Sequence, residues 1–170
     1  QAYWASGRWP SDDGGQLVGS YKQTLNHGIT AARKLDNWKE LAAWLTCLDG
    51  HGIPNDGRSE ESKRKEKRDR ANEIADAHRK LGQCDKALPW AKLAAELAMQ
   101  EFPEIKVKYA VTLACVGRFE DAGHEARVAF DMDPAGVRPK LASQFAELKS
   151  NGTQPGRGLD ALIARFAPTP

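Results

Sequence analysis

Apolar residues recur at spacings of three and four along most of this chain, which is the pattern of amphipathic helices. One such stretch runs from Leu17 to Ile29, and a second runs from Trp38 to Leu48. Because only a short link separates the two stretches, the pattern predicts an antiparallel helical hairpin over residues 16–53. No segment shows sustained alternation of apolar and polar residues, so we expect no β-sheet.

A charged segment follows the hairpin. After a loop at 54–58, Ser59 and two glutamates are typical of a helix start, because a hydroxyl cap and acidic residues stabilise a helix N-terminus. The next residues, ESKRKEKRDR, include no apolar side chain, and apolar spacing resumes only at Ala71. The pattern predicts one long helix from about 59 to 81, with a first half that stands in solvent or meets a partner.

Glycine and proline residues divide the remainder of the chain into further helices. Gly82 is expected to end the long helix, and Pro89 lies early in the next one, where it predicts a late start or a kink. The Asp133-Pro134 pair is expected to close another helix. The expected helices after residue 81 cover about 85–99, Pro103 up to Gly117, 119–131, 139–150 and 158–167.

Two segments of the chain are similar to each other at an offset of 35 residues. Glycine is expected to turn the chain between antiparallel helices, and alanine is expected where two helix backbones approach closely. An acidic residue just after the turn would meet the positive end of the second helix. The aligned pairs are Gly82 with Gly117, Asp85 with Glu120, Ala87 with Ala122, Ala94 with Ala129 and, upstream, Ala75 with Ala110.

The segment GRFEDAGHEARVAFDMDP, residues 117–134, resembles the second half of a tetratricopeptide repeat. It has the turn glycine, Phe119 two residues later, the two alanines and the closing Asp-Pro. The segment at 82–97 is similar, although Cys84 replaces the aromatic residue. Neither unit has a tryptophan near the start of its first helix, which is a departure from the family pattern. Residues 17–50 resemble a degenerate unit, in which the aromatic place is taken by Trp38, the glycine is replaced by Asp36 and the small residue is replaced by Leu41.

The resemblance implies an all-α fold, an α-solenoid of antiparallel helix pairs with a C-terminal capping helix. Because fewer than three units rarely stand alone, it favours counting the first hairpin as a repeat; the alternative is an unrelated alanine-rich helical bundle. The N-terminal arm contains Trp4 and Trp9. It is expected to be either a disordered tail or a segment that docks onto the domain or onto a partner. The expected organisation is an arm at 1–15, the hairpin at 16–53, a loop and charged helix extension at 54–67, two repeats at 68–136, and a capping helix with a tail at 137–170.

Composition narrows the class of protein without naming a function. The apolar share is 41% and the charged share 28%, both ordinary for a globular protein, and the net charge is +2. No apolar run approaches the roughly 20 residues that span a bilayer. The chain begins at Gln1, and a cleaved secretory signal is one explanation, which favours an exported or periplasmic protein over a cytoplasmic one.

The sequence contains no recognisable catalytic or metal-binding motif. Its four histidines are scattered, with no HExxH pattern, and no phosphate-binding or nucleophile motif occurs in a suitable context. The three cysteines, Cys47, Cys84 and Cys115, form no CxxC, so we interpret them as buried small side chains and expect neither a disulfide framework nor a zinc site. We therefore predict no enzymatic activity, no cofactor, no metal and no small-molecule substrate.

The charged segment at 58–70 is the strongest chemical feature, with seven basic and four acidic residues. Nucleic-acid binding is disfavoured, because no aromatic side chains are interleaved for base stacking. Two interpretations remain: a solvated helix held by ion pairs at spacings of four, or a surface for an acidic protein partner. The candidate partner-binding residues here are Lys63, Arg64 and Lys67.

The resemblance also implies a concave face lined by the first helix of each unit. By register, the lining residues are Asn72, Asp76, Arg79 and Lys80, then Lys108, Val111 and Thr112, joined by Asn26, Thr30, Arg33 and Lys34 if the first hairpin is a repeat. Because Asp76 stands among them, a clamp for a terminal carboxylate is not recognisable. A mixed, mildly basic groove for an extended or helical segment is expected.

These observations favour a protein–protein interaction scaffold or adaptor that binds a protein or peptide, including as a structural subunit of a larger complex. The alternative is a regulatory or accessory helical domain of a larger enzyme.

Overall fold

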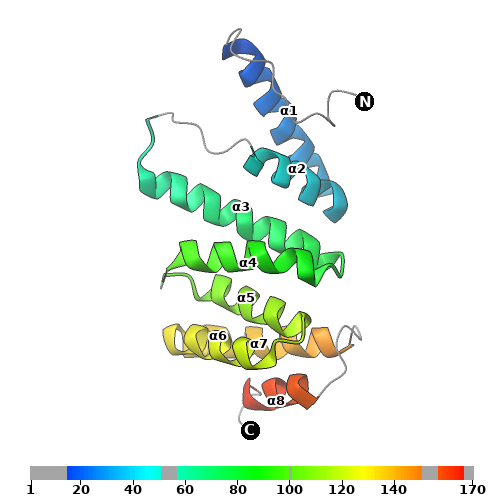
Figure 1. Cartoon of the computed structure of the whole chain (residues 1–170), viewed down its shortest axis with the longest axis vertical. Coiled ribbons are helices and arrows are strands. Elements are labelled where there is room, and N and C mark those ends of the chain that lie inside the picture. The colour runs from blue at the N-terminus through cyan, green and yellow to red at the C-terminus, as the bar shows by residue number, and fades with distance from the viewer. Residues whose placement is uncertain (1–14, 51–56, 100, 151–156, 167–170) are drawn as a thin grey trace.

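The computed structural model describes residues 15–50, 57–99, 101–150 and 157–166, and in these ranges the chain forms eight α-helices and no strand. Consecutive helices pack as pairs, and the pairs follow one another along the long axis of the molecule (Figure 1). None of the described helices is long and apolar enough to cross a membrane. The helices are α1 Gly15–Lys34, α2 Trp38–Gly50, α3 Glu60–Lys80, α4 Cys84–Ala98, α5 Pro103–Cys115, α6 Phe119–Met132, α7 Pro134–Ser150 and α8 Arg157–Phe166.

The turns inside the first three pairs share one backbone geometry. Gly82 and Gly117 have φ values of 69° and 80°, which confirms the expected left-handed turns, and Asp36 has a φ of 49°. In each turn the next residue donates its backbone N–H to the carbonyl five residues earlier, as Gln83 does to His78 at 2.9 Å. Aspartate is one of the few residues other than glycine that enter this region. The shared geometry supports the proposal that residues 16–53 are a degenerate repeat.

The alanines that the repeat aligns lie in the core. All those aligned at the 35-residue offset are buried: Ala75, Ala87, Ala94, Ala110, Ala122 and Ala129. The end of the stack is covered by α8, which buries Leu159, Leu162 and Phe166 against α6 and α7. The α-solenoid with a capping helix is therefore confirmed.

One proline prediction was wrong, and of the two alternatives given for the other the late start is excluded. Helix α7 begins at Pro134 instead of Pro139, because the Asp133 side chain caps it by accepting the backbone N–H of Gly136 at 3.0 Å. Helix α4 begins at Cys84 and includes Pro89, so no late start is seen. Both prolines inside helices lie in the second turn, where each removes one helical hydrogen bond without ending the helix.

The expectation that the cysteines are only buried thiols was wrong for two of them. Cys84 and Cys115 form a disulfide, with their Cα atoms 5.9 Å apart and a separation of 31 positions in sequence. The bond joins the first residue of α4 to the last residue of α5. Spacing along the chain could not indicate this pairing, because it arises from the packing of neighbouring helices.

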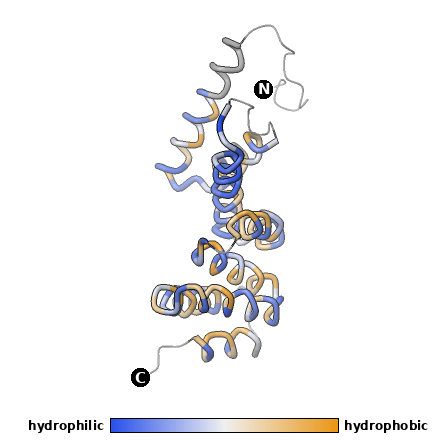
Figure 2. Tube along the Cα trace, turned by 90° about the vertical axis from the view of Figure 1, so that its left-hand side faces the viewer, coloured by the Kyte–Doolittle hydropathy of each residue, from blue (hydrophilic) through white to orange (hydrophobic). Residues whose placement is uncertain are grey.

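The charged first half of α3 is partly packed, and this corrects the expectation that it stands in solvent. Figure 2 looks onto the end where α3 begins and shows it as hydrophilic. Ser59 caps the helix as expected, accepting the N–H of Ser62 at 3.2 Å. The Arg64 guanidinium donates to the sulfur of Met99, and the guanidinium carbon of Arg68 lies 3.7 Å from the centroid of the Phe102 ring. The aliphatic chains and planar guanidinium groups of these arginines thus provide the packing surface that apolar residues provide in the other helices.

Residues 1–14, with Trp4 and Trp9, lie outside the described residues, so the arm stays a prediction. The same holds for part of the loop predicted at 54–58.

Candidate partner-binding face

Side chains of the first helix of each pair share one face of the stack, which we call the first-helix face. On α3 this face carries residues spaced by three and four, so they lie in one row along the helix. The row consists of Ser62, Glu66, Asp69, Glu73, Asp76 and Lys80. Its first part lines one hollow and its last part lines another. The row therefore connects two hollows on the same side of the molecule.

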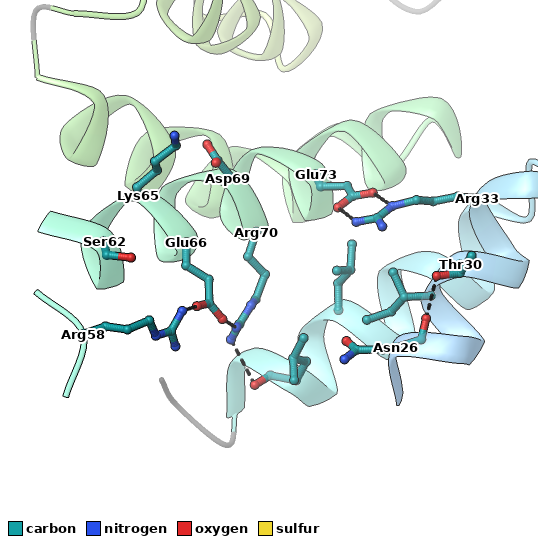
Figure 3. Close-up of a pocket in the computed structure, with 13 residues that line it drawn as sticks. Asn26, Thr30, Arg33, Arg58, Ser62, Lys65, Glu66, Asp69, Arg70 and Glu73 are labelled. Atoms are coloured by element: carbon teal, nitrogen blue, oxygen red, sulfur yellow. Dashed lines mark hydrogen bonds and ion pairs between the residues drawn. The ribbon is translucent and has the colours of Figure 1, made fainter. Parts of the chain in front are cut away.

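The N-terminal hollow lies between α1, α2 and α3 and has a volume of about 690 Å³. Its apolar lining consists of Ile29 from α1 and of Leu45 and Leu48 from α2, and the first two are buried. Polar and charged side chains of α1 and α3 surround these residues (Figure 3). The hollow therefore combines an apolar surface with charged walls.

An ion-pair cluster stands at each side of the N-terminal hollow (Figure 3). On one side Arg33 donates two hydrogen bonds to Glu73, which raise the pKa of the Arg33 guanidinium. On the other side both oxygens of Glu66 are occupied, one by Arg58 at 2.5 Å and one by Arg70 at 2.6 Å. The Arg70 side chain is only 5% exposed and also donates to the Leu48 carbonyl at 3.1 Å.

Positive charge is in excess around Glu66. Arg58, Arg70 and the exposed Lys65 line this side of the hollow. The carboxylates near them are those of Glu66, of Asp49, 3.7 Å from Arg70, and of Asp69, whose charge is compensated by its own pair with Arg68 at 2.7 Å. Because two guanidinium groups already donate to Glu66, its negative charge is compensated within the cluster. This side of the hollow is suited to an additional negative group.

The C-terminal hollow lies between α3, α5 and α7 and has a volume of about 440 Å³. Arg79 is fixed at its wall by donating to Asp76 at 2.8 Å and to Gln144 at 3.5 Å. Its other lining residues include Lys80, Val111, Glu147, Leu148 and both cysteines of the disulfide. The hollow thus has an apolar and sulfur-containing wall beside two cations.

Ion pairs cross the first-helix face from one helix pair to the next. Arg33 joins α1 to α3, and Asp76 joins α3 to α5 through Lys108. Lys140 joins α7 to α5 through Glu104 at 3.2 Å. The Glu104 carboxyl accepts a hydrogen bond from the Glu104 backbone and one from Lys140, and these two bonds lower its pKa. These pairs compensate most of the charge on the face.

Comparison with known proteins identifies the fold. No family model matches the sequence, and no curated protein matches it. Among solved structures, the chain superposes on YrrB, described as a TPR protein with an unusual peptide-binding site, with a TM-score of 0.58 and 17% identity over 89% of this chain and 72% of that one. This chain has the tetratricopeptide-repeat fold. A second superposition, on MamA MSR-1 C2, has a TM-score of 0.40 and 16% identity over 84% of this chain and 95% of that one.

Most of the residues predicted for the groove of this TPR fold lie on the first-helix face. Arg79, Lys80 and Val111 line the C-terminal hollow, and Asn26, Thr30 and Arg33 line the N-terminal hollow. Asp76 and Lys108 pair with each other between helices. Asn72, half-buried, and Lys34, exposed, lie outside both hollows. Thr112 is as buried as Val111 but lines neither hollow, and its hydroxyl donates to the Lys108 carbonyl at 2.8 Å.

The basic group predicted on α3 lies apart from the two hollows. Lys63 pairs with Glu60 at 2.8 Å, Arg64 packs on Met99, and Lys67 is exposed. All three lie outside the residues that line either hollow. Their role as partner-binding residues stays a prediction.

Sequence reasoning missed the charged row at the start of α3 and the contribution of α7. Glu66, Arg70 and Glu73 line the N-terminal hollow, and Gln144 and Glu147 line the other. The spacing of three and four was visible in the sequence, but α7 was assigned only to the cap. Among the described residues, no group of three or more His, Cys, Asp or Glu side chains is placed to hold a metal ion.

Proposed function

We propose that this protein is a TPR-type scaffold that holds a partner protein by a segment laid along the first-helix face. The observation that carries the proposal is the continuous row on α3, which lines both hollows. A segment lying along this row would contact helices of all four pairs. The description of YrrB as having a peptide-binding site supports the proposal by analogy of fold alone.

The chemistry of the N-terminal hollow indicates the kind of segment. An aliphatic side chain would pack chiefly on the half-buried Leu48, because burying apolar surface is favourable. A carboxylate next to it would approach Arg58 and Lys65, where positive charge exceeds negative. We therefore propose an extended partner segment that carries an aliphatic residue close to an acidic one.

We keep the proposal that the basic surface of Lys63, Arg64 and Lys67 makes a second contact. Exposed charge at the edge of an interface chiefly sets the association rate and orientation. Of the three side chains, Lys67 is the exposed one, so its reversal to glutamate should act mainly on the association rate at low salt. An association rate that is unchanged at low salt would remove this surface from the interface.

The test of the proposed function compares two double variants of the full chain. Proteins that copurify with it are identified, and the Kd of the purified partner is measured by calorimetry. Arg58→Glu with Lys65→Glu reverses the positive region, whereas Lys86→Glu with Lys92→Glu reverses two exposed cations on α4 and serves as the control. We expect about tenfold weaker binding for the first double variant only. Equal affinities for both double variants, or no copurifying partner, would contradict the proposal.

A further inference from the structure

The disulfide lies at the joint between the second and third helix pairs. Cys84 opens α4 and Cys115 closes α5, so the bond ties the α3/α4 pair to the α5/α6 pair. Both residues are buried, at 6% and 4% exposure, yet both line the C-terminal hollow. The bond is therefore shielded from bulk solvent and borders the first-helix face.

The neighbouring joints place an aromatic ring where this joint has a disulfide. Trp38 and Phe119 open α2 and α6 as Cys84 opens α4, each two residues after a turn residue with positive φ. Trp38 packs against the apolar cluster that includes Ile74 of the next pair, and the Phe119 ring lies against Gly158 of the next pair. Each ring thus fills the joint to the following helix pair. At the middle joint the covalent bond takes over that role.

Breaking the bond would leave two small thiols in a place that the other joints fill with a ring. Across this joint, the first-helix face is also held by the ion pair of Asp76 with Lys108. We propose that the disulfide is a redox-controlled staple of this face. Oxidised, it fixes the second pair against the third and shapes the C-terminal hollow; reduced, it lets the two pairs move.

The reduction step uses a small thiol as the reductant. Its thiolate attacks Cys115 Sγ, forming a mixed disulfide and releasing the thiolate of Cys84, which the N-terminus of α4 stabilises. A second thiolate of the same reductant then attacks the reductant-derived sulfur of the mixed disulfide. This step releases the Cys115 thiolate. Two reductant thiols are oxidised to one small disulfide, and the protein takes up two electrons. Arg79 and Lys80, which line the same hollow, would attract an anionic thiol.

The consequence for binding rests on the proposed function, whereas the staple itself does not. A segment that spans both hollows needs the second and third pairs in a fixed orientation, so we expect reduction to weaken its binding. Disulfides persist in oxidising compartments and are rare where thiols are kept reduced. The oxidation state trapped by alkylation in the intact cell would therefore report the redox conditions of its compartment.

The first test measures the bond without any partner. The folded full chain is incubated in glutathione buffers of increasing reducing strength and alkylated, and its intact mass is recorded. We expect two more alkyl groups in the reduced protein, appearing with one midpoint. We also expect about tenfold faster hydrogen exchange around 79–84 and 111–118, with α1 and α2 unchanged. Alkylation of both cysteines without reductant, or a bond that resists glutathione while the protein stays folded, would overturn the switch.

Two paired variants separate the staple from a general loss of folding. Cys84→Phe with Cys115→Ala supplies the ring that the neighbouring joints use, and Cys84→Ser with Cys115→Ser leaves the joint unfilled. We expect the serine pair to melt at least about 5 °C below the oxidised wild type. Added reductant should not change the melting temperature of the serine pair. The phenylalanine pair should melt above the serine pair and exchange slowly at the joint. Equal melting temperatures for the two double variants and the oxidised wild type would overturn the proposal. The affinity of these variants for the partner is measured separately, and it tests the proposed function.

Discussion

Replacing Gly82 with alanine should lower the free energy of unfolding by about 1 kcal/mol. A Cβ added at Gly82 would meet no atom within 4 Å, so the substitution causes no clash, and its cost comes from the φ of 69°. Holding an L-residue in this region costs about 1–2 kcal/mol. The lower entropy of the unfolded alanine variant returns about 0.4–1 kcal/mol. For a chain of this length the net loss corresponds to a fall in Tm of about 2–4 °C.

The assay is thermal and urea unfolding of three single variants. Gly50→Ala is the matched control, because a Cβ there also meets nothing within 4 Å, while Gly50 ends α2 and is not among the glycines with positive φ. We expect it to leave stability unchanged or slightly raised. Asp36→Gly should raise stability by less than about 1 kcal/mol, because it relieves a left-handed aspartate. Equal melting of the Gly82 variant and the wild type would refute the argument from backbone geometry.

Three further predictions address packing and charge. Ala122→Leu should destabilise the fold by about 1–3 kcal/mol in thermal melts, because Ala122 is 0% exposed and the larger side chain would overpack the contact; an unchanged melt would show loose packing there. Arg70→Met should cost about 2 kcal/mol in urea unfolding, because it leaves the Leu48 carbonyl without its donor, and a neutral result would show that water replaces it. Because the Glu104 carboxyl has a lower pKa in the folded protein than in the unfolded chain, its ionised form stabilises the fold above the unfolded pKa, and this stability is lost as the pH falls. Glu104→Gln should therefore flatten the fall of Tm with decreasing pH below about pH 4.5. An unaltered dependence of Tm on pH would contradict this.

The sequence was sufficient for the helices and their pairing because the determinants are local. Apolar spacing, glycine turns and small residues at contacts act within about 35 residues, and the repeat multiplies their signal. Gly117 illustrates this, since its place before Phe119 predicted the left-handed turn that is found. The register of the first helices likewise placed Arg79 and Val111 at the C-terminal hollow.

Features that depend on contacts between helix pairs could not be predicted in the same way. The disulfide of Cys84 and Cys115 needs the spatial meeting of α4 and α5. The packing of Arg68 on Phe102 makes a charged helix face part of the contact surface, which a binary pattern of apolar and polar residues treats as solvent-exposed. The hollow around Glu66 forms only because α1, α2 and α3 come together there.

Site-specific photo-cross-linking tests most directly the claim that a partner lies along the first-helix face. A benzophenone amino acid is placed at Lys65 or Glu147, which line the two hollows, or at Lys92 or Arg127 on the second helices. Lys92 and Arg127 match Glu147 in exposure, at 63% and 56% against 58%. We predict that the copurified partner is cross-linked from Lys65 and Glu147 and is not cross-linked from Lys92 or Arg127. Cross-links from the second helices alone would contradict the account.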